Sequence, residues 1–223
     1  MKINNTKKLT ALAMLTSMAF MVGAAIRLRG AFALMPWLTY DPKDAVILIG
    51  GFMFGPISAL LMSIMVALVE MITISNSGFF GAFMNALSSA SLTCTAAFIY
   101  SKKHDLKGAI TGLAAGCIMV TAVMILANYF IVPLFTPHAT REWVLTMIIP
   151  VLLPFNLMKS SLNAVLAILV YKKVSSALKS AGLYKEVLHD GNKNTANRFH
   201  IAVMVVSGVI AFILAVLFVL MTR

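Results

Sequence analysis

Apolar runs long enough to cross a lipid bilayer recur along this 223-residue chain, and they constrain its fold more than any other feature. A spanning helix needs about 20 apolar residues, and only helices or closed barrels satisfy their backbone polar groups in lipid. A run much longer than that must divide, as 45–74 is expected to do at Gly55-Pro56. The predicted fold class is therefore an all-α integral membrane protein. The expected spans are 9–28, 45–55, 56–74, 79–100, 108–134, 143–171 and 201–221.

Composition supports the membrane interpretation and excludes several other classes. The chain is 61% hydrophobic and only 11% charged, which is far from the balance of a soluble domain. Its net charge of +11 sits in short clusters between the apolar spans, as membrane topology predicts, so no nucleic-acid partner is expected. Cys94 and Cys117 lie inside apolar runs without the spacing of a disulfide framework or a zinc site. The sequence shows no nucleophile-base pair and no phosphate-binding loop of the kind that would indicate an enzyme.

The distribution of lysine and arginine predicts the orientation. The N-terminus and the connectors 101–107 and 172–198 together carry 12 of these residues, against five on the opposite side. Because cytoplasmic loops are enriched in Lys and Arg, we expect a multi-pass protein of the cell membrane with a cytoplasmic N-terminus. Seven spans then place the C-terminus outside the cell, and the 30–44 and 135–142 loops face outward as well.

Lys159 is the most unusual residue in the spans, because a helix over 143–171 places it near the middle of the bilayer. A cation at this depth costs about 3 kcal/mol on insertion scales, so it should face protein, a polar cavity or a ligand. Asn156, Lys159 and Asn163 share one helical face. Two interpretations stay open for Lys159. It contacts a ligand, or it fixes helix packing by pairing with Glu70 or with carbonyls freed by the nearby prolines.

Two further polar residues in the spans need partners. Glu70 is the only carboxylate inside an apolar run, so it requires a cation, hydrogen bonds, protonation or a position near the outer interface. Asn85 carries an amide that is costly to leave unpaired in lipid. Neither residue is assigned a role from the sequence.

Several motifs resemble one family, the substrate-binding S components of energy-coupling factor (ECF) transporters, and within it the riboflavin-specific members. The most specific motif is 154–159, PFNLMK, in the sixth span. The resemblance covers about 8–175. The other motifs that carry it are Asp41-Pro42-Lys43-Asp44, Gly55-Pro56, the stretch GAFMNALSSAS at 81–91, and Asn128-Tyr129 followed by Pro133.

The resemblance implies a six-helix S-component bundle, to which this chain adds one extra C-terminal transmembrane helix. The domains expected on this basis are a membrane domain at 1–178, a basic cytoplasmic linker at 179–198 and an appended transmembrane helix at 199–223. The family's small-residue motif for docking a partner subunit is matched only loosely, by Ala13 and Ser17.

The function implied by the resemblance is high-affinity riboflavin binding for vitamin uptake, without enzymatic activity or a cofactor. Riboflavin, or flavin mononucleotide, would be the transported ligand, and the partners would be a transmembrane T component and two cytoplasmic ATPases. The implied ligand contacts are Asn128, Asn156 and Lys159, with Tyr40 and Asp41 as candidates from the first outer loop. The alternatives are an S component for another vitamin, pantothenate or thiamin, and a membrane scaffold subunit without a transport role.

Overall fold

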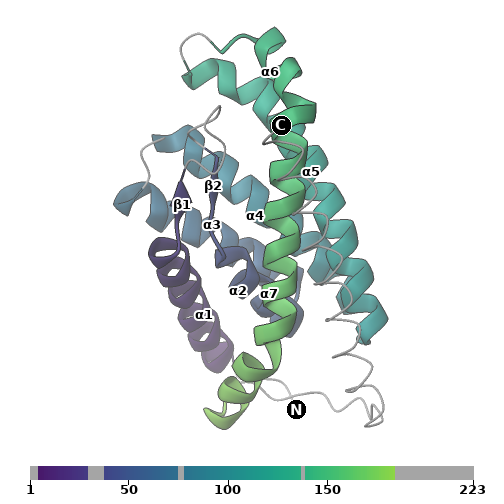
Figure 1. Ribbon diagram of the computed structural model, residues 1–223. Coiled ribbons are helices and arrows are strands. Elements are labelled where there is room, and N and C mark those ends of the chain that lie inside the picture. The colour runs from purple at the N-terminus through teal and green to yellow at the C-terminus, as the bar shows by residue number, and fades with distance from the viewer. Residues whose placement is uncertain (1–4, 30–37, 75–77, 137–138, 184–223) are drawn as a thin grey trace.

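A computed structural model describes residues 5–29, 38–74, 78–136 and 139–183, which form a helical bundle (Figure 1). The predicted seventh span, 201–221, lies outside the described residues, as does most of the predicted linker. The elements are α1 (Asn5–Ala25), β1 (Leu28–Arg29), β2 (Thr39–Tyr40), α2 (Lys43–Phe54), α3 (Pro56–Thr73), α4 (Gly78–Lys102), α5 (Leu106–Phe135), α6 (Arg141–Met147), a π-helical turn (Ile148–Leu152) and α7 (Leu153–Ser180).

Five of the six spans predicted within 9–171 are confirmed, and the remaining one, 45–55, forms a helix too short to cross a bilayer. Five helical segments in the described part of the chain are long and apolar enough to cross a bilayer, namely Thr6–Ala25, Pro56–Thr73, Gly78–Lys102, Leu106–Leu134 and Arg141–Ser180. Large apolar side chains such as Ile72, Ile118 and Ile149 are exposed on the outside of the bundle. Exposure of this kind suits a surface whose solvent is lipid rather than water.

The break predicted at Gly55-Pro56 is also confirmed, and it produces the central helix of the bundle. Gly55 has a φ of 92°, and Pro56 begins α3. The left-handed backbone at Gly55 is favoured by glycine, while proline suits a first helical position because no N–H is needed there. With 12 residues, α2 rises only about 18 Å, too little to cross a bilayer. It packs instead against α1, α3, α4 and α7, and almost all of its residues are buried.

A short antiparallel ladder between β1 and β2 was not predicted. Leu28 pairs with Tyr40 and Arg29 with Thr39, which joins the end of α1 to the segment that precedes α2. Two residues per strand are too few to show the alternation by which strands are detected in a sequence. The ladder matters because residues at its ends, Arg27, Thr39 and Asp41, enter the pocket described below.

The predicted sixth span is longer than expected and is interrupted by a π-helical turn. It extends from Arg141 to Ser180, and Pro150 lies within the turn at Ile148–Leu152. A proline removes one backbone donor and crowds the preceding turn, and a π-helical turn relieves that crowding by adding a residue to the turn. The turn sets the direction of α7, which carries Asn156 and Lys159.

Close contact between α4 and α5 depends on two glycines. A Cβ added at Gly112 would lie 2.7 Å from the carbonyl oxygen of Ala96, and one added at Gly116 would lie 2.7 Å from that of Leu92. Both neighbours are backbone atoms, so the helices themselves must separate to admit a methyl group. We expect Gly112→Ala and Gly116→Ala each to lower the stability by about 1–3 kcal/mol, measured by thermal unfolding in detergent.

The control is Ala114→Leu, because Ala114 is exposed on the same helix. It should change the unfolding midpoint little. Alanine is a better helix former than glycine by about 1 kcal/mol, so intrinsic propensity acts in the opposite direction to the expected loss. If Gly112→Ala and Gly116→Ala are as stable as the wild type, or more stable, the proposed close approach of α4 and α5 is contradicted.

Candidate ligand-binding pocket

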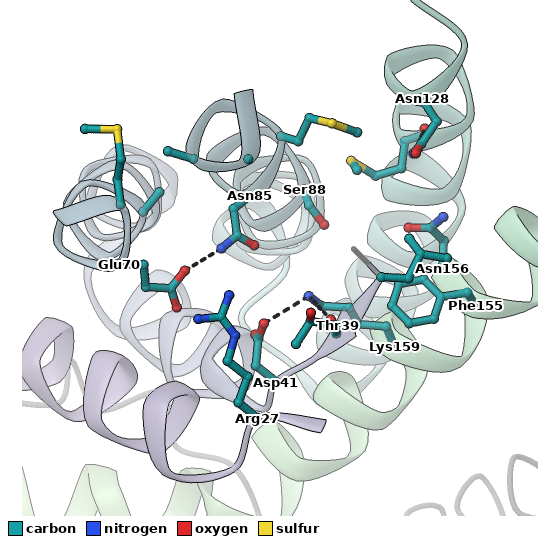
Figure 2. Close-up of a pocket in the computed structure, with 17 residues that line it drawn as sticks. Arg27, Thr39, Asp41, Glu70, Asn85, Ser88, Asn128, Phe155, Asn156 and Lys159 are labelled. Carbon is teal, nitrogen blue, oxygen red and sulfur yellow. Dashed lines mark hydrogen bonds and ion pairs between the residues drawn. The ribbon is translucent and has the colours of Figure 1, made fainter. Parts of the chain in front are cut away.

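A pocket with a volume of about 100 Å³ lies between the end of α1, the β2 region and helices α3, α4, α5 and α7 (Figure 2). Its lining combines charged and amide side chains with three methionines. The residues that line it are Arg27, Leu38, Thr39, Asp41, Ala67, Glu70, Met71, Gly81, Ala82, Met84, Asn85, Ser88, Met124, Asn128, Phe155, Asn156 and Lys159. Three of them, Asn128, Asn156 and Lys159, were predicted as ligand contacts, and Asp41 was predicted as a loop candidate.

One end of the pocket carries the two predicted asparagines, as Figure 2 shows. Asn128 on α5 donates its amide N–H to Met124 O, and Asn156 on α7 donates to Leu152 O, both at 2.7 Å. These bonds within each helix fix the amides, leaving their oxygens as acceptors. Asn128 is 1% exposed, and its Oδ1 has no hydrogen-bond partner in the described part of the chain. A buried acceptor without a donor is costly, and a ligand N–H would satisfy it.

Lys159 lies between the two ends of the pocket and is held by the loop before α2. Its Nζ donates to Thr39 O at 3.2 Å and to Asp41 Oδ2 at 3.3 Å. The packing interpretation that paired Lys159 with Glu70 is therefore wrong, because Asp41 takes that place. Asp41 Oδ1 is buried and has no partner among the described residues. Burial would raise the pKa of Asp41, but the nearby Lys159 and Lys43 outweigh it and hold the pKa below its usual value.

Glu70, Asn85 and Arg27 form the other end of the pocket. Glu70 is 3% exposed, so its charge must be met by partners within the protein. It has the cation and hydrogen bond that burial demands, since Lys43 Nζ lies 2.5 Å from its Oε2 and Asn85 donates to the same oxygen. Arg27 Nη1 donates to Ile74 O at 3.2 Å, while its buried Nε has no partner among the described residues.

Asn163 and Asp44 support the pocket without lining it. Asn163 is on the face predicted for it, but it donates to Asp41 O and accepts from Ala45 N, each at 3.1 Å. It thereby fixes the segment that precedes α2 against α7. Asp44 accepts a hydrogen bond from Ser89 on α4. These bonds attach the beginning of α2 to two other helices.

Tyr40 lies outside the lining of this pocket, although it is buried next to Asp41. Its backbone pairs with Leu28 in the ladder. Burial raises the pKa of its phenol, and the neighbouring Asp41 adds to that rise while Lys159 opposes it. Its predicted contact with a ligand stays a prediction.

Sequence reasoning missed Arg27 and Ser88 as pocket residues, and it left Glu70 and Asn85 without a role. Arg27 was counted only as a topology signal at the end of a span. Glu70 and Asn85 did carry a usable signal, since a carboxylate and an amide within apolar runs both require partners. Their spacing in the sequence could not reveal that they share the same partner cluster.

An all-α membrane bundle that encloses a pocket with fixed amides and paired charges has the construction of a solute-binding membrane protein. The model of the family "ECF transporter, substrate-specific component" matches residues 7–171. The chain belongs to this family.

Individual relatives agree with this assignment. Riboflavin transporter RibU of Staphylococcus aureus (strain TCH60) is 30% identical over 184 residues, which cover 80% of this chain and 96% of the relative. Riboflavin transporter FmnP of Bacillus subtilis (strain 168) is 27% identical over 177 residues, covering 75% of this chain and 92% of the relative. A solved structure described as the S component of a bacterial ECF transporter matches with a TM-score of 0.66 and 31% identity, over 79% of this chain and 99% of that one.

The buried pair between Lys43 and Glu70 yields a stability prediction. Removing one partner leaves an uncompensated buried charge, so Lys43→Met and Glu70→Leu should each cost about 3–5 kcal/mol. The double variant should cost clearly less than the sum of the two single variants, because neither charge is then left unpaired. Thermal unfolding in detergent measures all four proteins of the cycle.

Glu142→Gln is the matched control, since Glu142 is an exposed carboxylate at the beginning of α6. It should leave the unfolding midpoint unchanged. Additive losses in the double variant would show that the pair contributes nothing through its mutual contact.

Proposed function

We propose that this chain is the riboflavin-binding subunit of an ECF transporter, and that the pocket holds the flavin. The observation that carries the proposal is the buried, unpaired Oδ1 of Asn128, which lines the same pocket as Asn156 and Lys159. The names of the relatives in S. aureus and B. subtilis, both riboflavin transporters, support the choice of vitamin.

The polar groups at the amide end of the pocket complement one edge of a flavin ring. That edge alternates carbonyl acceptors with an imide N–H donor. The unpaired oxygen of Asn128 suits the N–H, and the ammonium of Lys159 suits a carbonyl. Phe155 lines the same end and offers an apolar surface to the flat ring. The ring would thus meet hydrogen-bonding groups at its edge and apolar groups on its faces.

The pocket must widen to admit a molecule of this size. Its volume of about 100 Å³ is small for a tricyclic ring with a side chain. Met71, Met84 and Met124 line it, and methionine side chains are unbranched and change shape at low cost. Their rearrangement would enlarge the pocket while the helices keep their positions.

The transport role rests on the family. We infer that a T component and two ATPases energise uptake, so that this chain binds the vitamin and carries out no reaction of its own. An S component for pantothenate or thiamin remains the competing assignment, and a scaffold subunit without a ligand is the second. A scaffold subunit without a ligand would leave the buried oxygen of Asn128 unpaired. Pantothenate and thiamin also carry hydrogen-bond donors, so the choice of riboflavin rests on the names of the relatives.

The assignment predicts tight flavin binding that depends on the amide end. Purified protein should quench riboflavin fluorescence at nanomolar concentrations. Asn128→Leu, Asn156→Ala and Lys159→Met should each weaken binding by about 10-fold or more, because each removes a hydrogen bond in a buried site. Fluorescence titration gives the affinity, and thermal unfolding gives the stability of the same samples.

Lys173→Met is the matched control for the lysine, because Lys173 is exposed on α7. It should bind as the wild type does. If the wild-type protein ignores riboflavin while thiamin or pantothenate raises its unfolding temperature, the vitamin is wrongly assigned. Equal losses of folded protein and of binding in the variants would assign these residues to packing alone.

We also propose that the N-terminus is cytoplasmic and that the pocket opens toward the outer face. The beginning of α1 and the end of α7 lie at the lower end of the bundle, while α6 lies at the opposite end (Figure 1). Since α5 ends beside α6, its beginning and the 102–107 lysines lie at the lower end too. The basic clusters therefore share one end, as the positive-inside rule requires.

Cysteine labelling tests this orientation. In a Cys94→Ala/Cys117→Ala background, a membrane-impermeant maleimide applied to whole cells should modify a protein carrying Glu142→Cys. It should not modify one carrying Ser101→Cys until the cells are opened. Both positions are exposed, so accessibility within the protein is matched. The reverse pattern would invert the topology.

A further inference from the structure

Asn163 on α7 is fully buried, and both polar atoms of its side chain are hydrogen-bonded. It is 0% exposed. Its Nδ2 donates to Asp41 O at 3.1 Å and to Lys159 O at 3.0 Å, and its Oδ1 accepts from Ala45 N at 3.1 Å. Two carbonyl acceptors and one N–H donor match the two hydrogens and the oxygen of an amide. Neither a carboxylate nor an apolar side chain would satisfy all three backbone groups.

The two bonds that Asn163 makes to another segment lie on either side of the beginning of α2. Asp41 precedes this helix, and Ala45 belongs to its first turn. One side chain therefore holds both ends of a five-residue stretch. Lys159 lies one turn before Asn163 on the same face of α7. The stretch that begins at Asp41 is thus fixed beside this lysine.

The direction of the Lys159 side chain depends on the position of that stretch. Its Nζ donates to Thr39 O at 3.2 Å and to Asp41 Oδ2 at 3.3 Å. A lysine has a flexible four-carbon stem, so its ammonium is aimed only by the groups that it contacts. Both acceptors belong to the segment that Asn163 fixes. An ammonium carries three hydrogens, and these two bonds leave one for a ligand.

We propose that Asn163 is a positioning residue for ligand binding, which acts through Lys159 and does not touch the ligand. The inference rests on the proposed function, because it takes Lys159 as a contact of the bound flavin. Binding is tighter when the polar groups of a site are already in place, since ordering them on binding costs free energy. With Asn163 present, the ammonium is aimed before the ligand enters. Without it, the segment before α2 and the lysine must be ordered during binding.

A double-mutant cycle on riboflavin affinity tests this role. Asn163→Leu should weaken binding by about 10-fold or more, as Lys159→Met should. In the Lys159→Met background, Asn163→Leu should weaken binding further by less than about 2-fold, because the group that it positions is then absent. Combined with Asn128→Leu, the losses should multiply, since the Asn128 amide is held within its own helix. Fluorescence titration measures each affinity.

Two further variants separate this role from a general effect on the fold. Asn163→Ser keeps a hydroxyl that can bond to the Lys159 carbonyl within α7, but it removes the amide that reaches α2. It should stay folded and show the same pattern as Asn163→Leu. Ser63→Ala is the matched control, because Ser63 is buried and hydrogen-bonded to Thr93 outside the pocket lining. It should lower the unfolding midpoint and leave the affinity unchanged.

The outcomes of the cycle distinguish this inference from the proposed function. Wild-type affinity in folded Asn163→Ser would overturn the inference, and so would losses that multiply with Lys159→Met. Losses that fail to multiply with Asn128→Leu would also overturn it, because the variant would then damage the whole pocket. All three results leave riboflavin binding intact. If the wild type does not bind riboflavin, the proposed function itself fails, and this inference fails with it.

Discussion

The fold depends on how two lysines are paired inside a membrane bundle. Lys43 and Lys159 are both buried, and each is held by a carboxylate, Glu70 and Asp41 respectively. Lone charges at such depth would be too costly to keep, so the helices that carry the partners must stay together. The first pair joins α2 to α3. The second joins α7 to the segment that leads into α2, so both pairs act on the beginning of that helix.

The beginning of α2 has no side-chain cap from the residue before it. Residues of other helices satisfy its first turn instead, and this fixes the position of α2. Pro42 precedes the helix and makes no side-chain capping bond. The oxygen of Asn163 accepts from Ala45 N, so a residue of α7 supplies the acceptor that a local cap would give. A short helix whose first turn is satisfied by other helices does not need water at its beginning. The bundle can therefore enclose almost all of α2, and the segment that leads into it, with Thr39 and Asp41, lines the pocket.

The sequence allowed the spans to be predicted because lipid imposes length and apolarity on each segment separately. The break at Gly55-Pro56 was predictable for the same local reason. The pairing of Lys159 was not, since Asp41 and Glu70 are both plausible partners until α2 is placed in the bundle. The short ladder that positions Arg27, Thr39 and Asp41 left no pattern at all. Local chemistry thus placed Asn156 and Lys159 on one functional helical face, and the family resemblance added Asn128, while the end with Arg27, Glu70 and Asn85 required the tertiary arrangement.

The buried polar atoms that lack hydrogen-bond partners lie close together, and one explanation covers all of them. Among the described residues, the buried polar side-chain atoms without partners are Arg27 Nε, Asp41 Oδ1 and Asn128 Oδ1, and all three residues line the pocket. Each such group costs about 1–3 kcal/mol when left unpaired. If these atoms were errors of packing, they would be scattered through the helices. Their concentration around one cavity, within the described residues, supports the proposal that a ligand binds there and completes them. On this proposal, the ligand-bound form is the more stable one, because binding replaces these unpaired groups by hydrogen bonds.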